Sequence, residues 1–168
     1  MGHDELHSLP FHIPAKRIEF WMGFSEQYLT CFNVLNQLGF LSHKPINVGD
    51  QQVIPLHVVK ALLPDPAALA PEHTGKVCIG CLVKGRKNGE EKKIFIHTIC
   101  DHAECFRDVE AQAIAYTTAV PAVTAALLIA RGDWNVNRMV NVEELDSDPF
   151  LALMPEIGLN WSVRRDPS

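Results

Sequence analysis

The sequence predicts an α/β (α+β) fold, in which a mixed, largely antiparallel sheet is backed by helices that include a long, buried, proline-kinked one. Three observations predict it. Asn88-Gly89 joins two segments of alternating apolar and polar residues, Ala111–Ala130 contains no charged residue, and the sequence has no glycine-rich phosphate loop. The first is a strong hairpin signal, the second is typical of a buried helix, and the third excludes a complete Rossmann domain.

Size and composition place the chain among soluble globular domains. It has 168 residues, of which 47% are apolar and 21% charged, enough to bury a full core without metal or disulfide staples. The net charge of −5 argues against a broad polyanion-binding surface, so nucleic acid is not an expected partner. Five cysteines without an apolar leader after Met1 predict a reducing, cytoplasmic location.

The first quarter of the chain is expected to form a helical turn, a strand and a helix. A short helical turn is expected at residues 4–9, ended by Pro10. Residues 17–22 alternate and predict a strand with one apolar face. Ser25 is the expected N-cap of a helix that continues at helical apolar spacing to Gly39.

Prolines punctuate the next segment. Between residues 42 and 74 they leave room for a short strand near residues 52–54 and a helix near residues 56–63. We interpret this segment as a capping insertion.

The register of the predicted hairpin follows from its turn. A two-residue turn at Asn88-Gly89 sets residues opposite each other when their numbers sum to 177. One face then pairs Val83 with Ile94 and continues apolar to the base, whereas the other face is polar near the turn and apolar near the base. We therefore expect the base of the hairpin to be covered on both sides.

A long helix is predicted from about residue 104 to residue 130. Its second part is apolar all round, which is typical of a central helix. Pro121 inside it frees the carbonyl of Thr117, so a kink is expected beside Tyr116, Thr117 and Thr118. Exposed carbonyls next to two hydroxyls favour a polar ligand there.

The uncharged segment is long enough to span a bilayer. Only six of the residues in Ala111–Ala130 are Ile, Val or Leu, and Gln112, Tyr116 and Pro121 disfavour insertion. A core helix is therefore predicted rather than a membrane span. Beyond it, Asp148 before Pro149 predicts the start of a short helix that ends near Gly158.

Six soft ligands within residues 78–105 suggest a zinc site by spacing alone. The hairpin register argues against it, because Cys78 and Cys81 lie three apart on a strand and point to opposite faces. We expect buried structural cysteines and no metal. Cys100 and His102 could form a nucleophilic pair, but no orienting group or oxyanion element accompanies them, so hydrolase chemistry is not favoured.

Charged residues offer two further candidates. Arg17, next to Trp21 in the predicted strand, could hold a carboxylate through its planar guanidinium, although an exposed strand-edge arginine is the simpler alternative. The acidic run that includes Glu143 could attract a polyamine cation, although such a run is most often a solvated face.

Several sequence blocks, taken in order along nearly the whole chain, resemble the C-terminal half of carboxynorspermidine synthases, which belong to the saccharopine dehydrogenase-like oxidoreductases. Ala119 is a departure, because glycine is expected before Val120-Pro121. The blocks that carry the resemblance are Arg17-Ile-Glu-Phe-Trp-Met-Gly-Phe24, Val53-Ile-Pro55, Ile79-Gly-Cys81, Tyr116-Thr-Thr-Ala-Val-Pro-Ala122, Asn141-Val-Glu-Glu-Leu-Asp-Ser-Asp-Pro-Phe150 and Gly158-Leu-Asn-Trp161.

The resemblance implies an NAD(P)-dependent oxidoreductase that condenses aspartate semialdehyde with a diamine and reduces the imine. NADP would be held by an absent N-terminal Rossmann domain. Residues 1–140 would form the substrate-binding and dimerisation domain of a homodimer, and residues 141–168 a tail that packs on the absent domain. A saccharopine dehydrogenase-type enzyme of lysine metabolism and a stand-alone, non-catalytic binding module remain alternatives.

For such an enzyme, the chemistry and position of the residues suggest site roles. A substrate carboxylate is assigned to Arg17 with Trp21 beside it, the distal ammonium to Glu143, and the region of the imine and nicotinamide to the helix near Pro121. The expected residues are Tyr116, Thr117 and Thr118 as catalytic, and Arg17, Trp21, Gln112 and Glu143 as substrate-binding.

Overall fold

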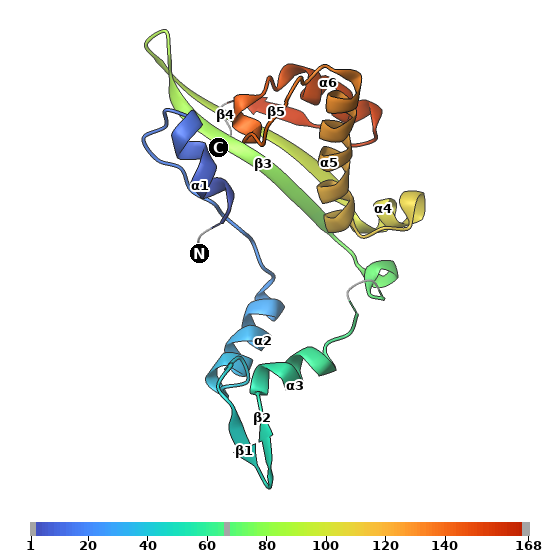
Figure 1. The fold of residues 1–168 in the computed structure, drawn as a ribbon. Helices are drawn as coiled ribbons and strands as arrows, with labels where there is room; N and C mark the ends of the chain where they lie inside the picture. The colour runs from blue at the N-terminus through green and yellow to red at the C-terminus, as the bar shows by residue number, and fades with distance from the viewer. Residues whose placement is uncertain (1–2, 66–67, 166–168) are drawn as a thin grey trace. The chain divides into compact units, whose positions relative to one another are not determined.

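The computed structural model describes residues 3–65 and 68–165, which form two compact units (Figure 1). One unit contains residues 3–10 and 15–65, and the other contains residues 11–14 and 68–165. Both combine helices with an antiparallel sheet, so the predicted mixed, largely antiparallel α/β class is confirmed.

The first unit is built from short elements. After α1 (Glu5–His12), which continues through Pro10, the chain forms α2 (Glu26–Gln37), β1 (Ile46–Val48), β2 (Gln51–Val53) and α3 (Pro55–Leu62). Ser25 caps α2 by accepting a hydrogen bond from the Tyr28 backbone N–H at 3.1 Å. The predictions of α2, β2 and α3 are confirmed, whereas β1, which pairs with β2, was not predicted.

The prediction of a strand at residues 17–22 is wrong. That segment is not part of any sheet, and the Trp21 side chain in it is 82% exposed. Alternation describes one face of a strand, but a strand also needs a neighbour for its backbone hydrogen bonds. The sequence pattern carried no information about that neighbour.

The second unit is organised by the long hairpin of β3 (Lys76–Lys87) and β4 (Glu90–Asp101). All its residue pairs sum to 177, so the predicted register is confirmed. Asn88 and Gly89 have φ values of 56° and 83°, the left-handed conformations that such a turn requires. A third strand, β5 (Ser162–Arg165), pairs with β4 and was not predicted.

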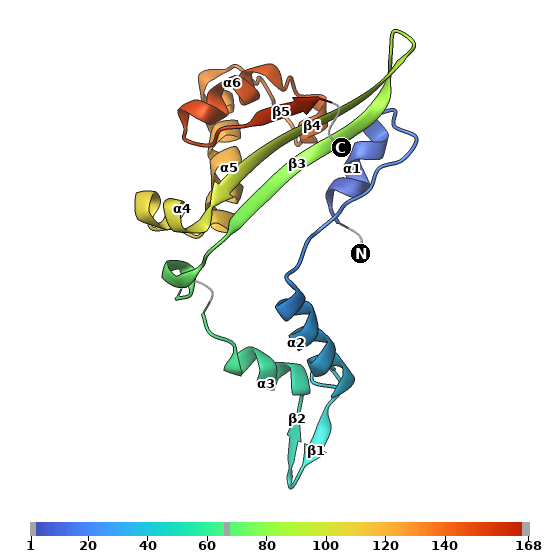
Figure 2. The ribbon, with the colours of Figure 1, turned by 180° about the vertical axis from the view of Figure 1, so that it is seen from behind.

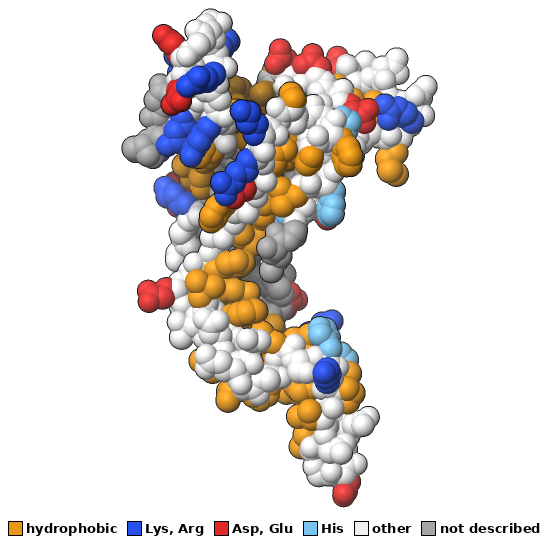
Figure 3. Space-filling model, turned by 90° about the vertical axis from the view of Figure 1, so that its left-hand side faces the viewer, with side chains coloured by type: hydrophobic (Ala, Val, Ile, Leu, Met, Phe, Trp, Pro, Cys, Tyr) orange, Lys and Arg blue, Asp and Glu red, His pale blue; other side chains and the backbone are white. Residues whose placement is uncertain are grey.

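The expectation that the hairpin base is covered on both sides is wrong for the described chain. Ile79 and Ile99 remain 48% and 55% exposed. In Figure 3, hydrophobic side chains are spread over the visible surface, and lysine and arginine side chains lie among them. Near the turn, Arg86 pairs with Glu91 at 3.4 Å and Lys92 with Glu90 at 2.7 Å.

The predicted long helix is divided in two. Asp101 caps α4 (His102–Val109), Glu110 ends it with a left-handed φ of 53°, and α5 (Ala113–Arg131) follows. Gly132 ends α5, and Pro121 lies inside it, as predicted.

The expectation that α5 is buried all round needs correction. Only one of its faces is buried, whereas Ile114 and Ile129 on other faces are exposed. The buried face consists of Ala113, Thr117, Val120, Thr124 and Leu128. By length and composition alone α5 could cross a membrane, but a core helix passes the same test.

The core of the second unit lies between α5 and the C-terminal segment (Figure 2). That segment contains the 3₁₀ turn η2 (Val142–Glu144), α6 (Asp148–Glu156) and β5, and another 3₁₀ turn, η1 (Ala70–Glu72), precedes β3. The predicted helix start at Asp148 is confirmed. Two buried clusters join α5 to this segment, one of Val120, Met154 and Leu159 and the other of Leu128, Trp134 and Leu153.

Candidate functional site

Gln112 and Tyr116 stand at the start of α5, one turn apart. Gln112 is the N-cap residue, and its carbonyl accepts the Tyr116 backbone N–H at 3.0 Å. The half-buried Tyr116 ring packs on the cluster of Val120, Met154 and Leu159. Its hydroxyl lies so close to the backbone of Gly158 that a Cβ atom there would overlap it.

The two threonines after Tyr116 differ in access. The Thr117 side chain is buried, and its hydroxyl donates to the Ala113 carbonyl at 2.9 Å. The Thr118 hydroxyl donates to the Ile114 carbonyl at 2.8 Å, but its side chain is exposed. Of these two hydroxyls, only that of Thr118 can meet a ligand without a change in helix packing.

Burial and nearby groups raise the pKa of the Tyr116 hydroxyl. Burial is the main cause that raises the pKa of Tyr116, and negative charge on Cys105, Cys100 and Asp108 adds to it. The phenol therefore stays protonated at neutral pH and can donate a hydrogen bond. Burial also raises the pKa of the Cys100 thiol to about 11, with contributions from Cys105, Asp101 and Glu104.

Arg17 and Trp21 belong to the first unit, whereas the other five predicted site residues belong to the second. The Arg17 guanidinium is exposed and pairs with the Glu19 carboxylate at 2.7 Å. Trp21 also presents its ring to solvent. Both side chains are thus open to solvent.

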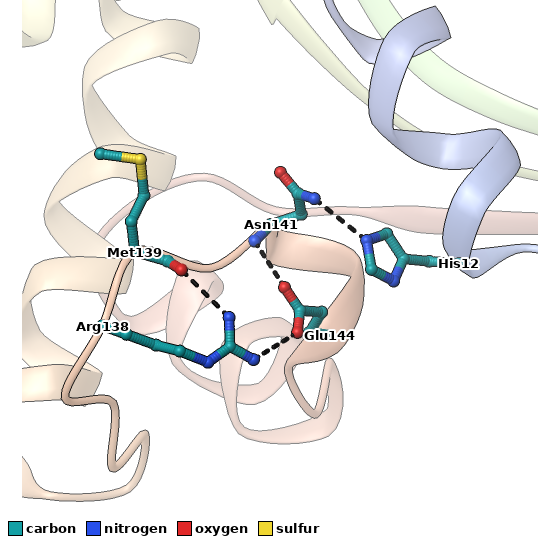
Figure 4. A network of polar contacts seen from close by, with 5 residues as sticks. All are labelled: His12, Arg138, Met139, Asn141 and Glu144. Carbon is teal, nitrogen blue, oxygen red and sulfur yellow. Dashed lines mark hydrogen bonds and ion pairs between the residues drawn. The ribbon is translucent and has the colours of Figure 1, made fainter.

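Glu143 lies half-buried in η2, next to a network that the sequence analysis missed (Figure 4). Glu144 accepts the Asn141 backbone N–H at 3.0 Å and the Arg138 guanidinium at 2.7 Å. The Arg138 hydrogen bond is the main cause that lowers the pKa of Glu144. Asn141 also contacts the His12 ring at 3.0 Å.

One sequence signal could have found part of this network. Asn141 and Glu144 form a capping box, whose spacing of three residues is visible in the sequence. Their contacts with His12 and Arg138 could be recognised only in the folded chain. The network fixes the position of η2, and therefore of Glu143.

Histidines and cysteines do not gather into a larger cluster. The expectation of buried structural cysteines is wrong for Cys78 and Cys81, which are exposed and point to opposite faces of β3, as their register requires. The His73 and His102 rings lie 5.2 Å apart, and His102 is 7% exposed. Within residues 3–65 and 68–165 no three His, Cys, Asp or Glu side chains are placed to hold a metal ion.

Comparisons with known proteins place the chain in a family. The Saccharopine dehydrogenase C-terminal domain matches residues 1–159. The chain is 54% identical over 165 residues to the carboxynorspermidine synthase of Vibrio alginolyticus, covering 98% of this chain. It is 53% identical to the enzyme of that name from Vibrio cholerae, over 97% of this chain.

A third relative carries a different name. The chain is 46% identical to the carboxyaminopropylagmatine dehydrogenase of Synechocystis sp., over 95% of the length of this chain. The chain spans 40% of the length of each of these three relatives. The match over most of the chain shows that it belongs to the family of the Saccharopine dehydrogenase C-terminal domain.

Proposed function

We propose that the chain is the C-terminal domain of an NAD(P)-dependent oxidoreductase that reduces the imine formed from aspartate semialdehyde and a diamine. The observation that carries the proposal is the identity of 54% and 53% to two proteins named carboxynorspermidine synthase, over nearly the whole chain. Such continuous similarity includes every residue block on which the sequence analysis relied.

The nicotinamide cofactor, when bound, supplies the hydride that reduces the imine carbon. This sequence has no phosphate-binding loop, so we assign NADP to a separate N-terminal domain. Residues 1–140 would bind substrate and contribute to a homodimer, and residues 141–168, of which the last three lie outside the described residues, would pack on the cofactor domain. A biosynthetic enzyme of this kind would work in the cytoplasm.

The chain's own residues would orient the two halves of the imine. The Arg17 guanidinium would hold the semialdehyde carboxylate, with Trp21 covering its aliphatic part. The Glu143 carboxylate would face the distal ammonium of the diamine. Orienting a reacting group in this way is where much of an enzyme's rate enhancement arises.

Tyr116 would act at the imine nitrogen. Because burial keeps its phenol protonated, the hydroxyl can donate a hydrogen bond to the nitrogen as that atom gains charge. The Thr118 hydroxyl and the Gln112 amide would supply further polar contacts along the same end of α5, and buried Thr117 would fix the helix backbone.

The test is NADPH oxidation by the full-length protein with aspartate semialdehyde and a series of diamines. Arg17→Ala should raise KM for the semialdehyde at least tenfold and leave KM for NADPH unchanged. Tyr116→Phe should lower kcat by about 10²-fold, as expected for loss of a positioned proton donor. Arg107→Ala, which removes an exposed arginine paired with Asp108, is the matched control.

A protein that oxidises no NADPH with any diamine would refute the proposal. Unchanged semialdehyde dependence in Arg17→Ala would refute the role of that residue alone. A second candidate substrate follows from the Synechocystis relative, whose name refers to an agmatine derivative. Agmatine is therefore included among the amines, and its preference over diamines would favour that second candidate.

A further inference from the structure

Two cysteines occupy a special pair of positions where β4 turns into α4. Asp101 is the N-cap of α4, so Cys100 precedes the cap and Cys105 is the fourth residue of the helix. In many helices the side chains at these two positions pack against each other and fix the angle at which the chain enters the helix. In this chain both positions carry a thiol.

The cap geometry brings these thiols near each other, and Cys105 is among the neighbours that raise the pKa of Cys100. The Cys100 thiol donates a hydrogen bond to the Asp101 carbonyl at 3.9 Å. Cys105 is only 6% exposed, whereas Cys100 is half-buried and can be reached from solvent. The pair therefore combines an accessible thiol with a protected one.

We propose that Cys100 and Cys105 form a dithiol site that small-molecule disulfides such as oxidised glutathione convert to an intramolecular disulfide. The Cys100 thiolate attacks one sulfur of oxidised glutathione, forms a mixed disulfide and releases one glutathione thiolate. The Cys105 thiolate then attacks the Cys100 sulfur and releases the second glutathione. The protein loses two electrons and two protons, and one disulfide of the oxidant becomes two thiols.

The groups around Cys100 and Cys105 determine how fast the pair is oxidised. Burial, followed by Cys105 on α4 and the carboxylates of Asp101 and Glu104, disfavours the Cys100 thiolate, and negative charge on the same two cysteines raises the pKa of Tyr116 on α5. With the pKa of Cys100 at about 11, the thiolate is scarce at neutral pH, so oxidation should accelerate about tenfold for each unit of pH between pH 7 and pH 9. The site would thus stay reduced except under sustained oxidation.

The experiment incubates the full chain with oxidised glutathione at pH 9, blocks remaining thiols with an alkylating reagent and digests with trypsin without reduction. The peptide of residues 94–107 contains Cys100 and Cys105 and no other cysteine. We expect it to lose the mass of two hydrogen atoms, to take up no alkylating group, and to regain two reactive thiols after treatment with dithiothreitol.

The chain supplies a matched control in the peptide of residues 77–84. It contains Cys78 and Cys81, which are exposed but point to opposite faces of β3 and cannot pair. Cys105→Ser should leave the mixed glutathione disulfide on Cys100. Persistence of that mixed disulfide in the unsubstituted chain, or double alkylation of peptide 94–107, would overturn the proposal. Neither result depends on catalysis, so the proposed function is tested separately.

Discussion

The Tyr116 hydroxyl lies against the C-terminal end of α6. At the C-terminus of α6, the Gly158 N–H donates to the Pro155 carbonyl and the Leu159 N–H to the Met154 carbonyl, which is the Schellman arrangement. This arrangement requires a left-handed residue, and Gly158 supplies it with a φ of 109°. The absent side chain at this glycine is what leaves room for the tyrosine.

Gly158→Ala should therefore destabilise the second unit for two reasons. Alanine is strained at a φ of 109°, and its Cβ would overlap the Tyr116 hydroxyl. We expect the free energy of unfolding to fall by about 2–4 kcal/mol. Urea unfolding followed by the fluorescence of Trp134 and Trp161, which lie in this unit, measures the change.

Gly132→Ala separates the two reasons. Gly132 has a φ of 81° at the end of α5, but a Cβ there meets no atom within 4 Å. Gly132→Ala should lower the free energy of unfolding by about 1 kcal/mol, because only the backbone strain remains. Combining Gly158→Ala with Tyr116→Phe should recover part of the loss, and equal losses at the two glycines would contradict the role of the tyrosine contact.

Among the elements, local turn chemistry decided which could be predicted. Asn88 and Gly89 specify a two-residue turn, and the turn specifies every pair of the hairpin. The Ser25 cap and the helix start at Asp148-Pro149 likewise located α2 and α6. The strand expected at residues 17–22 does not form and β5 was not predicted, both for one reason: pairing with a distant strand leaves no local signal in the sequence.

Gly80 in β3 shows how closely the hairpin strands approach. A Cβ at Gly80 would lie 2.5 Å from the Ile96 carbonyl oxygen and 2.8 Å from the Phe95 ring. Gly80→Ala should lower the free energy of unfolding by about 1–3 kcal/mol, because the backbone oxygen cannot move aside cheaply. Gly85→Ala, on the same strand with open space around it, should change it by less than about 0.5 kcal/mol.

The cap of α4 makes a pH-dependent contribution. The Asp101 carboxylate accepts the backbone N–H groups of Glu104 and Ala103, and the Glu104 hydrogen bond is the main cause that lowers its pKa. A carboxyl whose pKa is lower in the folded state stabilises it above the unfolded pKa, and this contribution is lost as the pH falls through the folded value. That window lies below about pH 4.

The free energies of unfolding of Asp101→Asn and the unsubstituted chain should therefore become more alike as the pH falls. Asparagine still caps the helix but has no charge, so the difference in unfolding free energy should be larger at pH 7 than at pH 3. Urea unfolding at both pH values tests this. Asp101→Ala, which loses the cap as well, should be less stable than Asp101→Asn at pH 7. A gap that widens toward pH 3 would contradict the assignment.

At the scale of the whole molecule, the site residues were predictable only in part. Gln112 and Tyr116 meet because they share a helix turn, which the sequence spacing already states. The network of His12 and Asn141 joins residues 129 positions apart, and no local pattern encodes it. Similarity to relatives over nearly the whole chain supports the proposed function without any knowledge of these contacts.

The two units differ in how well they are buried, and their stability should differ accordingly. Both buried clusters lie in the second unit, whereas α2 in the first unit has no buried residue. Amides exchange with solvent hydrogen through local opening, which is easier where few apolar contacts must be broken. In hydrogen-exchange mass spectrometry of the full chain, peptides from α2 and α3 should exchange at least tenfold faster than those from α5 and the part of β4 paired with β5. Equal protection of α2 and α5 would mean that α2 is stabilised by contacts beyond those within its own unit.

Because the relatives are about two and a half times as long as this chain, the same measurement on a full-length protein should show slower exchange in α2 if the additional domain covers its exposed apolar side chains.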